Sequence, residues 1–156
     1  MAQGDVVIFD DAIEYLLTGS PDCPFDLGAS PDTIKIAIVN NVIVPSTTTD
    51  NPAWGAGGAT NLSTNEESGG SMTVGGLTMG SVVVSVVGGV PQLDMADPAT
   101  WSQNGSNPTA CFWGIVYSDT ATNKNCLAYV DLGGSFDATT GDLTITWGAP
   151  FMTANQ

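Results

Sequence analysis

The sequence predicts a mainly β fold: an antiparallel β-sandwich or jelly-roll-like domain with one N-terminal helix. Short apolar segments separated by Gly-, Pro- and Asn-rich turns fill the second half of the chain. Apolar residues at helical spacing occur near the N-terminus. The 156 residues show no internal repeat and no dividing linker, so we expect a single β-rich domain over residues 1–156.

The expected helix covers residues 5–18. Its apolar residues form one stripe, made of Val6, Phe9, Ile13, Leu16 and Leu17. Asp5 can cap the N-terminus of this helix, and Gly19 with Pro21 can end it.

Further segments are expected to be strands, namely residues 33–44, 77–79, 82–87, 110–117, 126–132 and 143–147. The nearly pure valine segment 82–87 predicts a strand that is buried on both faces. In segment 143–147, Leu143, Ile145 and Trp147 alternate with polar residues and are expected to point inward.

Segments 110–117 and 126–132 predict an antiparallel pair whose connecting loop is symmetric about residues 121 and 122. The expected partners are Tyr117 with Cys126, Ile115 with Ala128, Trp113 with Val130, Cys111 with Leu132, and Gly114 with Tyr129. This register separates Cys111 from Cys126, so a disulfide between them is not expected. The odd number of cysteines, three, fits a protein made in a reducing cytoplasm.

Residues 46–71 form the long irregular stretch of the sequence. A loop of this length predicts a functional or partner-ordered excursion, and a floppy surface loop with one short strand is the equal alternative. Trp54 must either fold back onto the domain or be buried against a partner. The same two alternatives hold for Trp101, whereas Trp113 and Trp147 are expected in the core.

The charge of the chain excludes several classes of function. Two lysines, Lys35 and Lys124, face sixteen acidic residues, which gives a net charge of −14 with no His and no Arg. Nucleic acids and anionic membranes are therefore not expected as partners. Catalytic triads and metal sites that need His are impossible, and we expect no enzyme activity, no metal and no cofactor.

Acidic pairs are the remaining candidates for chemistry. Asp94 with Asp97, and Asp137 with Asp142, could hold Ca²⁺ or act as a glycosidase pair. Asp in Gly- and Thr-rich segments is more typical of turns, so a structural role is favoured. Glu66 and Glu67 are expected in solvent.

The longest apolar run, Val82–Val90, is too short to cross a bilayer. The first residues lack the basic start of a secretory signal, so we expect synthesis in the cytoplasm.

The order and spacing of several segments resemble a known group of proteins. These segments are Phe9–Gly19, Asp32–Val39, Gly75–Thr78 with the valines behind it, Gly114–Asp119, Leu127–Gly134 and Asp142–Trp147. Together they resemble small tailed-bacteriophage virion proteins, including head decoration (cement) proteins. The resemblance implies a β-rich domain that binds the outside of the expanded capsid, with the major capsid protein as partner, self-association as a homotrimer and localisation on the virion. It carries no catalytic residues.

The expected function is therefore capsid decoration, and the partner contacts are expected at Trp54, Asn61, Glu66, Glu67 and Trp101. Replacement of Trp54 by Ala is then expected to weaken attachment and to leave the fold intact. The alternatives are a neck or tail component of the virion and a glycan-binding module that uses exposed Trp or Tyr for host attachment. A Ca²⁺-dependent or hydrolytic enzyme comes last.

Overall fold

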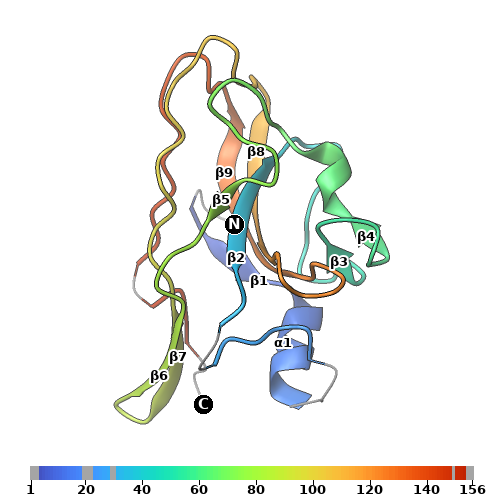
Figure 1. Ribbon diagram of the computed structural model, residues 1–156, viewed down its shortest axis with the longest axis vertical. Helices are drawn as coiled ribbons and strands as arrows, with labels where there is room; N and C mark the ends of the chain where they lie inside the picture. Colours follow the sequence, from blue (N-terminus) through green and yellow to red (C-terminus); the bar gives the residue numbers. More distant parts are fainter. Residues whose placement is uncertain (1–3, 19–22, 29–30, 149, 154–156) are drawn as a thin grey trace.

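In the computed structural model, which describes residues 4–18, 23–28, 31–148 and 150–153, strands dominate and one α-helix lies near the N-terminus (Figure 1). The strands are β1 (Val6–Ile8), β2 (Ile34–Val39), β3 (Pro52–Ala53), β4 (Thr60–Asn61), β5 (Leu77–Thr78), β6 (Val83–Val87), β7 (Val90–Asp94), β8 (Cys111–Ser118), β9 (Cys126–Phe136) and β10 (Met152–Thr153). The helices are α1 (Asp10–Thr18) and the 3-10 turn η1 (Leu62–Asn65). The predicted mainly β fold with one N-terminal helix is confirmed.

The main sheet has five strands in the order β1-β9-β8-β2-β5, and every neighbouring pair in it is antiparallel. It is covered on both faces. On β8, Gly114 and Tyr117 point to opposite faces, because side chains alternate along a strand. The Ile145 side chain lies against Gly114 on one face, and Trp54 stacks on Tyr117 on the other. The buried apolar side chains of the described chain form one continuous cluster.

The N-terminus differs from the sequence prediction, because the helix begins at Asp10 and not at residue 5. Val6–Ile8 instead form β1, which pairs with the long strand β9. Three consecutive β-branched residues favour a strand when an edge is available for pairing. Asp5 is therefore not the cap of α1, while Gly19 and Pro21 lie outside the described residues.

Strand β2 ends at Val39, five residues before the predicted end at Val44. Asn40 turns the chain there, because its Oδ1 accepts the Val42 N–H at 3.0 Å and its Nδ2 donates to Glu67 Oε1 at 3.0 Å. Beyond this turn Val42 and Val44, which were predicted within the strand, lie outside it and are exposed.

The β8–β9 register agrees with the prediction at Tyr117 and Cys126 and then shifts by one residue. The extra residue is Leu127 in β9, a bulge in the ladder. The observed partners are therefore Ile115 with Tyr129, Gly114 with Val130, Trp113 with Asp131 and, after a second irregularity, Cys111 with Phe136. The predicted face of apolar pairs was wrong beyond the first pair, because one bulge moves each later partner by a residue.

Residues 46–71 are packed onto the domain. Within them β3 and β4 form a short parallel pair, and η1 follows directly. Leu62 at the start of η1 is 1% exposed. The stretch is thus ordered by contacts within this chain, and Figure 1 shows it to one side of β2.

A smaller sheet has the order β10-β7-β6, in which β10 near the C-terminus pairs with the hairpin of residues 83–94. Residues 143–147 were predicted as a strand, but in the structure Leu143 makes an isolated bridge with Trp101. The inward alternation is nevertheless confirmed at Leu143 and Ile145, which are buried. Trp113 and Trp147 are half-buried and do not lie fully in the core.

Candidate functional site

The β6–β7 hairpin exposes the largest group of apolar side chains in the described chain. The exposed fractions of the β6 valines are 51% for Val83, 53% for Val84, 67% for Val86 and 57% for Val87. The prediction of a strand buried on both faces was wrong, because the hairpin projects from the end of the domain (Figure 1). A run of valines specifies a strand, but the strand's place in the fold decides whether its faces are covered.

A tight turn connects the two strands. Gly88 and Gly89 both have positive φ angles, 58° and 84°, as a two-residue type I′ turn requires. Pro91 lies in β7 opposite Val86. The turn fixes the register, so the hairpin presents a defined surface.

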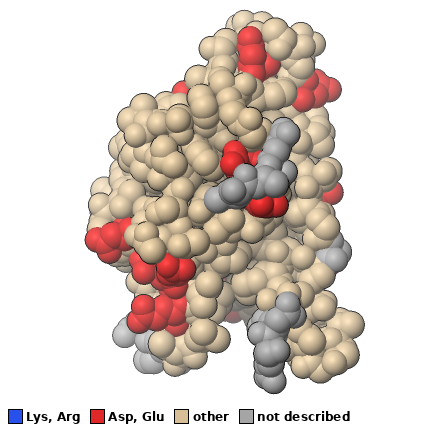
Figure 2. All heavy atoms as spheres, turned by 180° about the vertical axis from the view of Figure 1, so that it is seen from behind, with Lys and Arg blue, Asp and Glu red and all other residues tan. Residues whose placement is uncertain are grey.

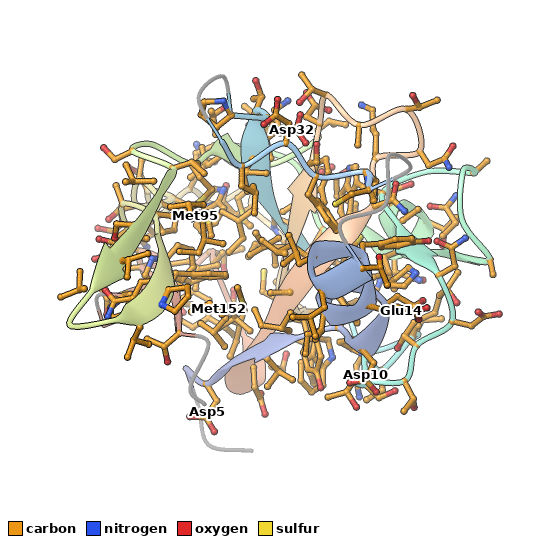
Figure 3. All side chains as sticks on the ribbon, turned by 90° about the horizontal axis from the view of Figure 1, so that it is seen from below. Asp5, Asp10, Glu14, Asp32, Met95 and Met152 are labelled. Atoms are coloured by element: carbon orange, nitrogen blue, oxygen red, sulfur yellow. The ribbon has the colours of Figure 1, made fainter. Side chains whose placement is uncertain are left out.

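An apolar groove of about 320 Å³ runs between this hairpin and α1. Its lining consists of Leu16, Leu17, Leu27, Val84, Pro91, Gln92, Leu93 and Met152. Leu17, on the last turn of α1, is 77% exposed. In Figure 3 Met95 and Met152 lie on the side of the hairpin, whereas Asp10 and Glu14 lie on the other side, at the helix.

The hairpin carries one charged side chain, Asp94 at the end of β7 opposite Val83, and the other acidic groups lie elsewhere. Residues 79–93 contain no charged side chain, in a chain whose net charge is −14. Asp10 and Asp11 occupy the first turn of α1, where carboxylates favour the helix dipole. Figure 2 shows acidic groups over the helix side and none on the projection at the lower right, where the hairpin lies. Apart from Asp94 at its base, the hairpin is therefore an apolar surface without charge on an acidic protein.

The two tryptophans expected at a partner contact lie mostly inside this chain. Trp54 is 6% exposed, and its ring stacks on Tyr117 with centroids 4.9 Å apart and an interplanar angle of 15°. Trp101 is 2% exposed, and its backbone exchanges two hydrogen bonds of 3.0 Å with Leu143. These side chains have little surface left to offer a partner.

The other expected contact residues are also engaged locally. Asn61 Oδ1 accepts the Ser63 N–H at 3.1 Å and so caps η1. Glu66 Oε1 accepts the Gly75 N–H at 2.5 Å, and burial raises the pKa of the Glu66 carboxyl. Both glutamates are half-buried, so the expectation of a fully solvated pair was wrong, and Glu67 holds the Asn40 amide.

Both lysines of the chain converge on one carboxylate. Lys35 Nζ lies 2.8 Å from Asp119 Oδ2, and Lys124 Nζ lies 2.6 Å from Asp119 Oδ1. These hydrogen bonds, that of Lys124 foremost, lower the pKa of Asp119. The three side chains and Glu66 border a cleft of about 440 Å³ above Trp54. Two ammonium groups and two carboxylates balance there, so the cleft has no net attraction for an anion.

The carboxylates of the predicted acidic pairs each accept a backbone N–H. Asp94 and Asp137 bond to residues close to them in the sequence, whereas Asp97 and Asp142 tie distant segments together. Asp137 Oδ1 accepts the N–H of Thr139 at 2.9 Å, Asp97 Oδ1 accepts that of Trp147 at 3.0 Å, and Asp142 Oδ1 accepts that of Gln103 at 2.6 Å. Over the described ranges, no group of three or more Cys, Asp or Glu side chains is placed to hold a metal ion.

The cysteines are unpaired thiols. Burial raises the pKa of Cys111 to about 11 and raises that of Cys126 as well, so both remain protonated and unreactive near neutral pH. Cys23 is half-buried.

No family model, no curated protein and no solved structure matches the chain. A functional assignment therefore depends on the chain's own surface and chemistry. In the part of the chain that the structure describes, no helix is long and apolar enough to cross a membrane.

Among the described residues, the hairpin and its groove form an exposed apolar surface that can act on another molecule. Apolar, uncharged side chains on a projecting element can bury themselves against a complementary apolar surface. Sequence reasoning missed this site, although the absence of charge over residues 79–93 was a signal for it.

Proposed function

We propose that this chain is a non-enzymatic structural protein of a tailed-bacteriophage virion, a decoration (cement) protein that binds the outer surface of the expanded capsid and stabilises it. The observation that carries the proposal is strand β6 of the β6–β7 hairpin, which has no charged residue and exposes valines on both of its faces. Contiguous apolar surface of this kind marks a site of protein–protein contact. The sequence resemblance to small virion proteins selects the major capsid protein as the partner.

The proposed contact uses the faces of the hairpin and the groove beside Leu17. Burying the exposed half of one valine contributes about 1 kcal/mol, and several such side chains act together. When one copy bridges neighbouring capsomers, the free energy of this contact stabilises the capsid lattice against outward strain. The net charge of −14 keeps free copies apart before they bind.

The proposal is tested by co-sedimentation of the purified protein with expanded capsids that lack it and with unexpanded precursor shells. We expect saturable binding to the expanded shells alone. Binding to neither shell would overturn capsid decoration and favour a neck or tail position. A glycan array run beside it should be blank, and a specific signal would favour host attachment.

A matched pair of variants assigns the contact surface. Leu17→Gln places a polar group at the groove. Val42→Gln is the control, because it also replaces an exposed apolar side chain by glutamine, but in the segment after β2. The exposed fractions are 77% for Leu17 and 78% for Val42. We expect Leu17→Gln to weaken capsid binding at least about tenfold and Val42→Gln to leave it unchanged. Equal effects of the two changes would contradict the assignment of the groove.

A further inference from the structure

Strand β6 is the outer strand of its sheet, and among the described residues β7 is its only ladder partner. Its outer edge therefore carries backbone N–H and C=O groups that can accept another strand. Proteins usually protect such an edge with charges, a proline or a covering segment, and β6 has neither a charge nor a proline.

The turn determines which backbone groups face this edge. In a type I′ hairpin the residues that flank the two turn glycines, Val87 and Val90, form a hydrogen-bonded pair, and the two kinds of pair then alternate along the ladder. Val86 and Pro91 form the next, non-hydrogen-bonded pair, as suits Pro91, which has no N–H. The N–H and C=O groups of Val84 and Val86 consequently point to the free edge.

The sequence of β6 is the same in both directions: Val83-Val84-Ser85-Val86-Val87. An antiparallel pairing of two copies centred on Ser85 therefore places each valine opposite a valine and serine opposite serine. Val84 then faces Val86 of the second copy, and both have free backbone groups, so they exchange N–H···O bonds in both directions. The symmetric pair does the same on the other side of the axis.

We propose that two copies of this chain associate through their β6 edges, across a two-fold axis at Ser85, into one continuous sheet. Self-complementarity of this kind is what a two-fold interface requires. The axis falls within the uncharged residues 79–93, which keeps carboxylates away from the contact between two chains of charge −14. The pairing belongs to the free chain and does not rest on capsid binding, and it leaves the faces of the hairpin available to a capsid.

The interface is small. A strand of five residues buries less than the roughly 800 Å² per partner of a standard stable interface, so the dimer should be reversible and concentration-dependent. The remaining charge repulsion is screened by salt, so added salt should strengthen the dimer.

Cysteine cross-linking tests the register directly, in a Cys23→Ser background that removes the half-buried native thiol. Ser85→Cys places two thiols in a non-hydrogen-bonded pair with Cβ atoms about 4.5–5.5 Å apart, near disulfide distance. Val83→Cys is the matched control, since residue 83 faces residue 87 of the second copy and is about 13 Å along the strand from its own equivalent.

We expect mild oxidation to convert Ser85→Cys to a disulfide-linked dimer at least about ten times faster than Val83→Cys. Equal rates, or no cross-link at Ser85→Cys, would overturn the proposed pairing.

Sedimentation equilibrium tests the association itself. The wild-type mass should rise with concentration from 15.9 kDa towards twice that value. Val86→Pro removes an outward N–H without touching the β6–β7 ladder and should hold the mass at one chain, whereas Val86→Thr keeps the N–H and should dimerise. A strictly monomeric wild type, the homotrimer that the resemblance implies, or undiminished dimerisation of a folded Val86→Pro would each refute the proposal.

The two proposals fail separately. Leu17→Gln should lose capsid binding and retain the concentration-dependent dimer, because Leu17 lies in the groove and not on the β6 edge.

Discussion

Gly76 occupies a position where the backbone of one strand meets another without room for a side chain. Its φ angle is +70°, a conformation that L-residues disfavour. A Cβ built on Gly76 would lie 2.0 Å from the carbonyl oxygen of Ile36 and 2.6 Å from the Cα of Ala37. Both atoms are backbone of β2, so no side-chain rotation can relieve the overlap. Gly76→Ala must therefore push β5 away from β2.

The expected cost follows from a comparison with Gly88. Gly88 has a φ of +58°, but a Cβ there would meet nothing within 4 Å. The left-handed conformation costs an alanine about 1–2 kcal/mol. The reduced entropy of the unfolded chain returns about 0.4–1 kcal/mol, so Gly88→Ala should lose about 1 kcal/mol. Gly76→Ala adds the loss of the β2–β5 pairing and should lose about 4 kcal/mol or more, within the range of severe backbone and packing defects.

Urea unfolding monitored by tryptophan fluorescence measures both values, since the chain has four tryptophans as reporters. A loss in Gly76→Ala that stays within about 1 kcal/mol of the loss in Gly88→Ala would refute the steric explanation. In that case the β2–β5 contact would not be as close as the structure places it.

Two further changes test the packing and the charges around Trp54. Trp54→Ala should lower the free energy of unfolding by about 3 kcal/mol or more, because it removes a buried ring stacked on Tyr117; unchanged stability in urea unfolding would support the sequence expectation that the fold stays intact. Glu66→Gln keeps an oxygen for the Gly75 N–H and removes the charge whose burial raises the pKa of Glu66. A pKa raised by folding makes the stability of the wild type fall as pH rises. The free energy of unfolding of Glu66→Gln should therefore rise relative to that of the wild type between about pH 4 and 7. A difference between the two proteins that stays constant over that range would contradict the expected pH dependence.

The N-terminal segment shows how local pattern and pairing compete. Val6, Phe9 and Ile13 have helical spacing, yet Val6-Val7-Ile8 is also a β-branched run. β9 is eleven residues long and offers its edge to this run, and the ladder outweighs helix propensity there. Only α1, from Asp10 onward, keeps the predicted state.

In the candidate site too, local sequence signals predict the strands but not their burial. Alternation and β-branched residues correctly predict strands at β2, β6 and β8, because these signals act within a few residues. They do not report burial. The sequence left undecided whether Trp54 and Trp101 are buried. Tyr117 covers Trp54, and the segment of Leu143 covers Trp101. Both contacts join residues that are far apart in the sequence.

The sequence by itself determined the mainly β class, the presence of an N-terminal helix, the absence of a Cys111–Cys126 disulfide and the strand at residues 83–87, because composition and residue spacing act locally. Only the tertiary structure decided the bulge at Leu127, the convergence of both lysines on Asp119 and the exposure of the β6 valines. Each of these depends on which distant segments pack together, and the hydrophobic effect that drives packing favours burial without specifying which of several apolar segments is left outside.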